Sequence, residues 1–328
     1  MADMNLEPDD VRLMPIRLRR ELLATGYDDA AILRAVRSGQ WTRARRGAYV
    51  NAAPFASLDE RSKHAVRARA AVKQAKTEVV VSHASEIALY PDPIPTWGLD
   101  LRNLHLTRRD GRSGRKEAGI QQHRGRLAEG DVVRIGDVDV TSPARALLEV
   151  TTMATLEVGI VLASCLLHRR LVTMEQLVQR YSGAMDRWPQ TLTTDLVLRL
   201  ADGRLESVAE GRVFHLCFAQ SLPMPCPQYE VRDPSGRVVA RLDFAWPDLG
   251  VWVEFDGRVK YQELLREGES VTDVVLREKQ RQEMIEDLTG WRCIRLTWAD
   301  LARPEWVAAK IRAAFSRSAA ARWLLPSA

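Results

Sequence analysis

The chain of 328 residues lacks several features that would place it in a class at once. Its four cysteines are widely spaced, with no CxxC pair and no cysteine–histidine cluster, which argues against a zinc site and a disulfide framework. The longest apolar run, residues 155–167, is too short to span a membrane. The acidic N-terminus lacks the basic and apolar segments of a signal peptide. We therefore expect a globular protein of the reducing cytoplasm, with no membrane partner.

Positive charge is unevenly distributed along the chain. The net charge is +5, yet residues 196–328 hold 19 basic and 19 acidic residues, so the whole excess precedes them. It is concentrated in residues 11–50, with nine arginines against three acids, and in residues 102–126, with eight basic residues against two acids. Two basic clusters on a near-neutral background predict a polyanionic partner such as nucleic acid. The alternative is that the arginine-rich composition reflects only a GC-rich genome.

Residues 1–56 carry the pattern of a winged helix-turn-helix, a DNA-binding domain. The first of two helix patterns ends at Gly26, Asp28 caps the second, and a basic hairpin over 41–50 follows. The alternative is a small helical cap with a solvated basic face. The arginines that we expect to meet DNA phosphates are Arg34 and Arg37 on the second helix and Arg43, Arg45 and Arg46 on the wing.

Residues 57–195 predict a central α/β domain. The segment EVVVSHASEIALY is typical of a buried strand that leads into a helix, and Ser142 followed by Pro143 is a strong helix start. The segments DLRNLHLTR and DVVRIGDVDVTS favour strands. The region shows no catalytic constellation. Its scattered histidines, which we interpret as structural, are His83, His105 and His123.

Residues 196–328 predict the order helix, three strands, helix, strand, and carry a crowded set of acids. The segment RLDFAWPDLGVWVEFDG reads as two strands around a tight turn. Because side chains alternate along a strand, Glu254 and Asp256 share the face of Trp252, and the opposite, apolar face is predicted to meet the core. Folding back at the turn brings Asp243 opposite or diagonal to Glu254, with about 5 Å between Cβ atoms.

These carboxylates need a physical reason to be so close. Two carboxylates at about 5 Å repel each other by roughly 3 kcal/mol at an effective dielectric of about 20. A protein keeps such a group when it is solvated, when one member is protonated, or when a cation lies between them. Hard divalent cations bind oxygen donors. We therefore favour a Mg²⁺ (or Mn²⁺) site over a solvated sheet edge.

The third region resembles the restriction-endonuclease-like PD-(D/E)XK superfamily, and in particular its branch related to very-short-patch-repair endonucleases. The likeness covers about residues 200–315 and rests on SVAEGR, RLDFAW, EFDG and REKQRQ before GWRCIRLTW. It implies an αβββαβ core in which a bound Mg²⁺ lowers the pKa of water for phosphodiester hydrolysis. The metal ligands and catalytic acids that the resemblance implies are Glu210, Asp243, Glu254 and Asp256.

One residue departs from the pattern of that superfamily. The superfamily has a lysine two residues beyond the last acid, where its positive charge stabilises the transition state. This chain has Asp256 at that place. The resemblance therefore transfers the role to Lys260 as first choice, or to Lys279 on the following helix as second.

Residues 11–55 and 78–150 resemble the N-terminal parts of AbiEi-type antitoxin proteins, in RRGAYV, VVVSHAS and VTSPARALLEV. The expected class is therefore α/β (mixed α+β) and multidomain, with domains over 1–56, 57–195 and 196–328. The expected function is that of a DNA-binding protein with a Mg²⁺-dependent nuclease-like domain, in phage defence, toxin–antitoxin biology or DNA repair. The alternatives are an antitoxin-like transcriptional regulator with an inactive nuclease fold, and a scaffold for a cognate toxin or other protein partner.

Overall fold

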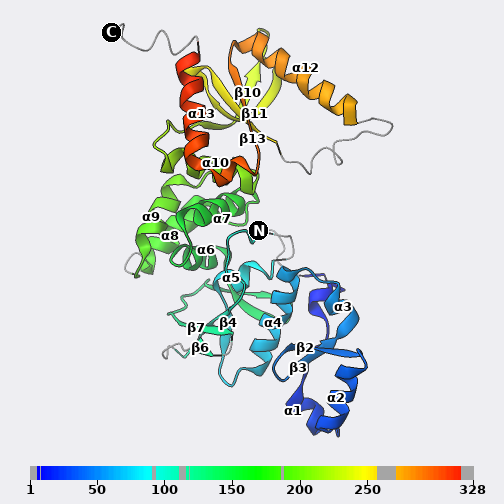
Figure 1. Ribbon diagram of the computed structural model, residues 1–328. Coiled ribbons are helices and arrows are strands. Elements are labelled where there is room, and N and C mark those ends of the chain that lie inside the picture. Colours follow the sequence, from blue (N-terminus) through cyan, green and yellow to red (C-terminus); the bar gives the residue numbers. More distant parts are fainter. Residues whose placement is uncertain are drawn as a thin grey trace. The chain divides into compact units, whose positions relative to one another are not determined.

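The computed structural model describes residues 6–318 except 8, 91–93, 111–115, 118, 186–187 and 257–270 (Figure 1). The chain divides into two compact units, residues 1–201 (the first unit) and residues 202–328 (the second unit). Both units combine helices with sheets, which confirms the predicted mixed α/β, multidomain class. The predicted boundaries after residues 56 and 195 stay a prediction. None of the described helices is both long and apolar enough to cross a membrane.

The first unit begins with two short helices and a three-stranded sheet. Gly26, with φ +93°, follows the first helix and adopts a backbone conformation that favours glycine. The side chain of Asp28 accepts a hydrogen bond from the backbone N–H of Ala31 at 2.6 Å and caps the second helix. The sheet is antiparallel, with order β1-β3-β2. The elements are β1 (Arg17–Leu18), α1 (Arg19–Ala24), α2 (Asp29–Arg37), β2 (Trp41–Arg45), β3 (Ala48–Asn51) and α3 (Ala52–Ala56).

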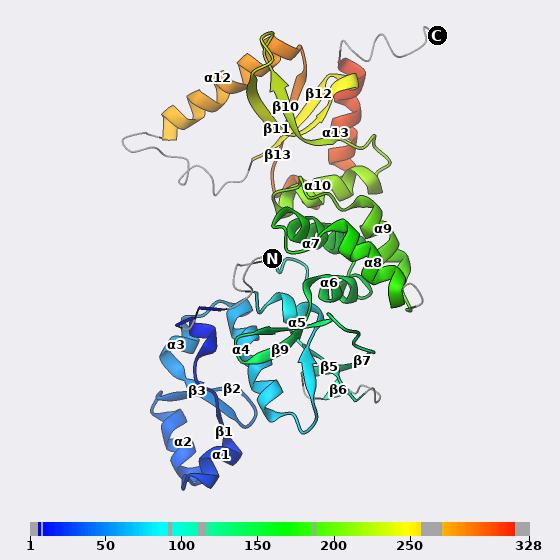
Figure 2. The same ribbon diagram turned by 180° about the vertical axis from the view of Figure 1, so that it is seen from behind.

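Helix α4 (Glu60–Gln74) links this winged part to a six-stranded sheet. Val66 and Ala70 pack in the core of the three-stranded sheet, whereas Ala65 and Ala68 pack against the larger one. The larger sheet has the order β6-β7-β5-β4-β9-β8. Its strands are β4 (Val79–Val81), β5 (Leu104–Arg108), β6 (Lys116–Glu117), β7 (Ile120–Arg124), β8 (Val132–Ile135) and β9 (Val138–Thr141). One helix therefore contributes to two cores (Figure 2).

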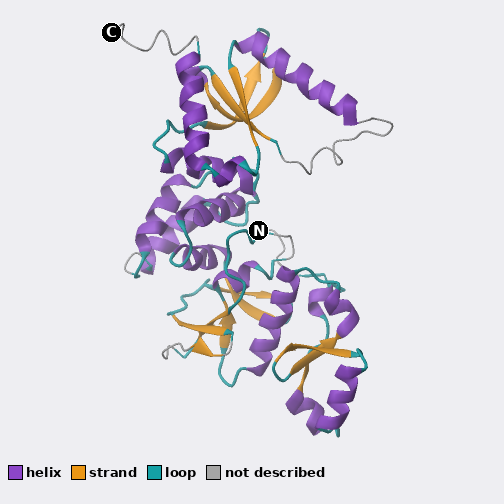
Figure 3. Ribbon diagram, in the orientation of Figure 1, coloured by secondary structure: helices purple, strands orange, loops and turns teal. Residues whose placement is uncertain are grey.

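Helices complete the first unit. Ser142 has extended backbone and Pro143 stands in the first turn of α6, as the sequence predicts. Helix α5 follows β4 directly, so its first residue lies at the end of a buried strand. The later helices pack on α6 as a helical layer (Figure 3). The helices are α5 (His83–Ile87), α6 (Pro143–Thr151), α7 (Leu156–His168), α8 (Met174–Ala184) and α9 (Thr191–Leu200).

The second unit has the predicted order of helix, three strands, helix and strand, followed by a last helix. Its sheet has the order β10-β11-β12-β13, in which β12 and β13 are parallel and the other neighbours are antiparallel. The elements are α10 (Val208–Ala219), β10 (Cys226–Arg232), β11 (Val238–Trp246), β12 (Val251–Phe255), α12 (Val271–Thr289), β13 (Arg292–Leu296) and α13 (Pro304–Arg317).

The predicted core face of β12 is confirmed at Val251 and Val253, which are fully buried, but the opposite face is buried as well. Trp252 is fully buried and packs in a cluster with Ile285 of α12. On the other face, Phe244 of β11 stacks with Phe214 of α10, with ring centroids 6.4 Å apart. Helix α12 thus covers one face of the sheet, while α10 and α13 lie on the other (Figures 1 and 2). Parallel strands are usually covered on both faces, and the alternation of side chains along one strand does not reveal a second covered face.

Candidate functional site

The helices and wing of the first unit border a groove of about 760 Å³. Arg43 and Arg46 of the wing line it, together with Leu33 and Val36 of α2. At its edge, Arg19 Nε donates to Asp29 Oδ1 at 2.8 Å. A groove lined by wing arginines and by residues of the second helix suits contact with both phosphates and base edges.

The five predicted DNA-binding arginines are not equivalent in the structure. Arg34 and Arg37 are exposed on α2 but do not line the groove. Arg43 and Arg46 are exposed and line it. Arg45 is partly buried, with its Nε and Nη1 atoms shielded from solvent, next to an irregularity in the strand register between Arg43 and Arg45. The structure thus separates the predicted set into groove arginines, helix-surface arginines and one partly covered residue.

In the second unit, Asp243 of β11 and Glu254 of β12 meet as predicted. The antiparallel ladder pairs Phe244 with Val253, so the next pair toward the sheet end is Asp243 and Glu254. Asp243 Oδ2 also accepts a hydrogen bond from the backbone N–H of Phe255 at 2.8 Å. Burial and the negative charge of Asp243 raise the pKa of Glu254 to about 7.

Glu210 of α10 belongs to the same electrostatic group, which we call the acidic cluster (Glu210, Asp243 and Glu254). Its carboxylate accepts hydrogen bonds from Ser207 Oγ at 2.6 Å and from Gln228 Nε2 at 2.7 Å. Burial raises the pKa of Glu210, and the charge of Asp243 raises it further. Asp243 thus acts electrostatically on both Glu210 and Glu254, although the ligand oxygens of the three acids do not all lie within 4.8 Å of one another.

A cation from the protein already lies beside this cluster. Both terminal nitrogens of Arg281, on α12, lie 3.1 Å from Glu254 Oε1, and the same side chain donates to the carbonyl of Arg241 at 2.8 Å. Its positive charge opposes the rise in the pKa of Glu254. Sequence reasoning singled out the segment REKQRQ but did not choose Arg281. A strand-to-helix contact of this kind has no signature in local sequence.

The remaining predicted site residues are placed as follows. The backbone N–H of Asp256, just after β12, donates to the carbonyl of Leu296 at 2.7 Å. Lys279 is exposed, with Nζ 3.6 Å from Glu283 Oε1 on its own helix, and so lies away from the acids. Lys260 lies outside the described residues. The catalytic roles of these residues stay predictions.

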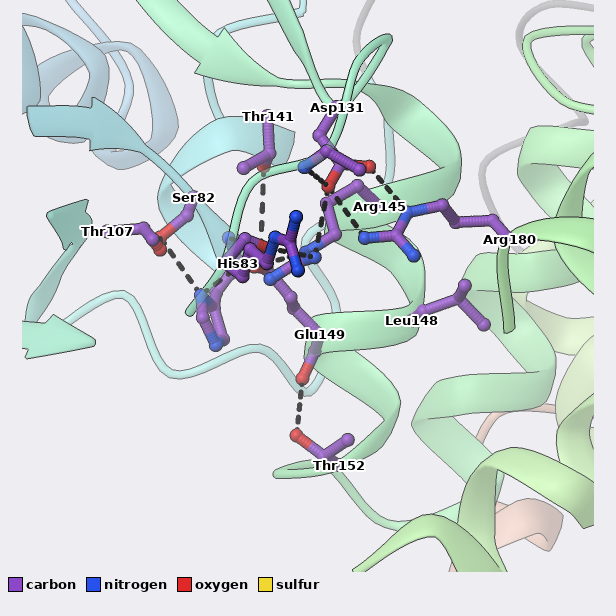
Figure 4. A network of polar contacts seen from close by, with 12 residues as sticks. Ser82, His83, Thr107, Asp131, Thr141, Arg145, Leu148, Glu149, Thr152 and Arg180 are labelled. Carbon is purple, nitrogen blue, oxygen red and sulfur yellow. Dashed lines mark hydrogen bonds and ion pairs between the residues drawn. The ribbon is translucent and has the colours of Figure 1, made fainter. Parts of the chain in front are cut away.

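The structure brings together three histidines that the sequence analysis treated as scattered. His83 opens α5, His105 lies on β5 and His123 lies on β7. Their ligand nitrogens lie within 4.8 Å of one another, and across the described part of the chain no other trio of histidine, cysteine or acidic side chains meets that criterion. We call this group the histidine cluster. Figure 4 shows the polar network that surrounds His83.

Comparisons with known proteins bear on the first unit in particular. Residues 18–52 match a family model described as transcriptional regulator, AbiEi antitoxin. That range coincides with the strands and helices of the winged helix-turn-helix. Two uncharacterized proteins of Mycobacterium tuberculosis, one from each of two strains, are 31% identical to the chain over 116 residues. The match covers 35% of this chain and 39% of each relative.

Proposed function

We propose that this protein is a DNA-binding transcriptional regulator of the AbiEi antitoxin kind. One observation carries the proposal: the family match over residues 18–52 falls on a folded helix-turn-helix and wing whose exposed arginines face outward. In a winged helix-turn-helix, the second helix enters the major groove and the wing contacts the backbone. Here α2 takes the first role and the hairpin β2–β3 takes the second.

Charge supports this assignment of roles. Arg43 and Arg46 project from the wing beside the groove, where they suit phosphate contacts. Arg34 and Arg37 extend the basic surface along α2. Such contacts release counterions, so the affinity for DNA falls steeply with added salt. The finer expectations, operator control beside a cognate toxin in the cytoplasm, belong to the same proposal.

The test is a titration of full-length protein against labelled duplex DNA by fluorescence anisotropy, at several salt concentrations. Changing Arg43 and Arg46 together to Ala is expected to weaken binding and to reduce the slope of log affinity against log salt by about 1.8, since each phosphate contact contributes about 0.9. The pair Arg34→Ala and Arg37→Ala reports separately on α2. The matched control is Arg170→Ala with Arg199→Ala, which removes the same charge from exposed positions of the helical layer.

Two outcomes would refute the role of the wing. Either the Arg43/Arg46 variant keeps the slope of the unchanged protein, or the Arg170/Arg199 control loses as much slope. In the first case the wing does not touch phosphate. In the second case the salt dependence reports net charge and no specific surface.

A second candidate function is favoured by the acidic cluster. Glu210, Asp243 and Glu254 supply the hard oxygen donors that Mg²⁺ or Mn²⁺ binds, and burial together with the charge of Asp243 raises the pKa values of Glu210 and Glu254. A bound ion would polarise a phosphodiester and lower the pKa of water. We propose this metal-dependent nuclease activity for the second unit. Arg281 forms an ion pair with Glu254. This pairing favours the alternative, in which the nuclease-like domain is inactive and serves only for binding.

Cleavage assays separate these possibilities. Full-length protein is incubated with duplex DNA, single-stranded DNA and RNA in Mg²⁺, in Mn²⁺ and in EDTA. Cleavage that needs the ion and is lost in Glu254→Gln supports the nuclease. Ion-dependent cleavage that persists in that variant points to a contaminating enzyme, and no cleavage under any condition leaves the regulatory function alone.

A further inference from the structure

The histidine cluster is built by strand order. Strand β5 lies between β4 and β7, pairing antiparallel with the first and parallel with the second. This order brings His105 and His123 onto neighbouring strands and places His83, which follows β4, beside them. The Nδ1 atom of His105 lies 2.9 Å from Nε2 of His123. The rings of His83 and His123 stack with centroids 3.7 Å apart.

The three imidazole rings are neutral, so each can offer a nitrogen lone pair to a metal ion. A separation of 2.9 Å between two ring nitrogens requires that one carries a proton and the other offers a lone pair. Burial lowers the pKa of His123 to about 3 and also lowers the pKa values of His83 and His105. Neutral imidazole is the form that binds a metal ion. For both facing nitrogens to bind an ion, the proton between them must move to the other nitrogen of its own ring, which is a change of tautomer without net release of a proton at neutral pH.

The buried carboxylate of Glu149 lies next to the ring of His83. His83 Nδ1 lies 3.0 Å from Ser82 Oγ and 3.4 Å from Glu149 Oε2. Because Nδ1 faces these oxygens, Nε2 is the nitrogen of His83 that remains for a ligand. Histidines that bind metals usually donate their second ring N–H to a carboxylate or another oxygen, which orients the ring. Glu149 and Ser82 are positioned to accept the Nδ1–H of His83 and to orient its ring.

Glu149 is itself held in place by a buried network (Figure 4). Arg145 Nε donates to Glu149 Oε1 at 2.7 Å, and Arg145 Nη1 lies 3.2 Å from Asp131 Oδ2. Arg180 Nη2 donates to the same Asp131 oxygen at 2.6 Å. The side chains of Arg145, Glu149 and Asp131 are each about 1% exposed. A carboxylate fixed in this way cannot easily turn away from His83.

The cluster is connected to a cavity. His83 and His105 line a space of about 300 Å³ that is also bordered by Asp100, Asn103 and Met153. The opening provides a path by which an ion reaches the rings and room for a water or a small ligand at a further coordination position. A site with three protein ligands and one open position is a common arrangement for Zn²⁺.

We propose that His83, His105 and His123 bind a divalent transition-metal ion of the Zn²⁺ class. Imidazole ligands suit Zn²⁺, Co²⁺, Ni²⁺ and Cu²⁺, whereas Mg²⁺ and Ca²⁺ prefer oxygen. Binding requires a local adjustment, because ring lone pairs lie in the ring plane and the His83 ring is stacked on His123. The nitrogens of His105 and His123 must also separate from 2.9 Å to about 3.3 Å, as two bonds of about 2.0–2.1 Å around a tetrahedral ion require.

The test is a Co²⁺ titration of chelator-treated, full-length protein in excess Mg²⁺, which occupies carboxylate sites. We expect one Co²⁺ per chain, a visible absorption band of low-symmetry coordination, and displacement by Zn²⁺. His105→Gln and His123→Gln should lose the band, while His168→Gln, at the exposed end of α7, keeps it. Glu149→Gln should keep the stoichiometry but bind about 10–100-fold more weakly, as the loss of a positioning group predicts.

A measurement on the unchanged protein guards against variants that fail to fold. X-ray absorption of the Zn²⁺-loaded chain should show three imidazole nitrogens at about 2.0–2.1 Å. An ion with at most one imidazole ligand, or no ion bound at all, would overturn the proposal. So would a Co²⁺ band that survives in folded His105→Gln and His123→Gln proteins, because the ion would then lie elsewhere.

Discussion

The acidic cluster and the histidine cluster differ in the charge of their side chains, which are acidic in the first and neutral in the second. Each contains three potential metal ligands at a sheet, but only the nitrogens of the histidine cluster all lie within 4.8 Å of one another. In the acidic cluster the ligands repel one another, so Glu254 has a raised pKa and takes Arg281 as a partner. In the histidine cluster the ligands are neutral, so the rings of His105 and His123 share a hydrogen bond and both stack with His83. The charge of the ligands determines how much an empty site destabilises the folded protein. It also determines which ion the site prefers.

The largest expected effect concerns the network behind the histidine cluster. Changing Arg145 to Met removes the cation between two buried carboxylates, and should lower the free energy of unfolding by about 3–5 kcal/mol. Urea denaturation of full-length protein, followed by circular dichroism, measures the change. The control is Arg134→Met, which breaks a pair with Asp139 on the surface and should cost at most about 1 kcal/mol. Equal losses in the two variants would show that the buried network does not stabilise the first unit.

The second-largest expected effect is the stabilisation of the second unit by a divalent ion bound at the acidic cluster. If Mg²⁺ or Mn²⁺ binds Asp243 and Glu254 only in the folded state, a hundredfold excess over Kd stabilises the second unit by about 2.7 kcal/mol. Hydrogen exchange of amides in β11 and β12 measures this in the full-length chain. Glu254→Gln should abolish the added protection and be at least as stable without metal, since one repelling charge is gone. If protection is unchanged in the presence of Mn²⁺, the acidic cluster does not bind the ion, and its side chains are only paired polar groups.

The pH dependence of Glu254 gives a smaller effect. Its pKa is raised from 4.5 to about 7, so between these values the folded state binds more protons than the unfolded state. The stability of the second unit should therefore fall as the pH rises through this window, by at most about 1.4 kcal/mol per pH unit. Hydrogen exchange at about pH 5 and about pH 7.5 measures the slope. Glu254→Gln should flatten it, and an equal slope in that variant would contradict the assignment.

The histidine cluster should respond to pH with the opposite sign. The pKa of His123 is lowered from 6.5 to about 3, so below pH 6.5 the unfolded state binds more protons than the folded state. The first unit should lose stability as the pH falls below that value, again by at most about 1.4 kcal/mol per unit. The same exchange experiment, read from amides of β5 and β7, reports it. His123→Gln is expected to reduce the slope, whereas exposed His168→Gln leaves it unchanged. If stability changes with pH in the same direction in both units, the predicted difference between the acidic cluster and the histidine cluster is wrong.

Much of the local structure was predictable because its causes are local. Asp28 caps α2 by accepting a hydrogen bond from the backbone N–H three residues later, Pro143 stands in the first turn of α6, and Gly26, with φ +93°, follows α1. The pairing of Asp243 with Glu254 was also predictable, since one tight turn joins their strands. Each of these features is decided within a few residues of chain.

The assemblies that join distant segments were not predictable. His83, His105 and His123 meet only because β5 is inserted between β4 and β7, a strand order that no single segment encodes. Arg281 reaches Glu254 only because α12 folds over one face of the sheet. The sequence by itself thus determined the elements, their order and the adjacent acids, through short-range propensities and one hairpin. The tertiary structure decided which histidines share a site and which cation faces the acids, because those contacts depend on long-range packing.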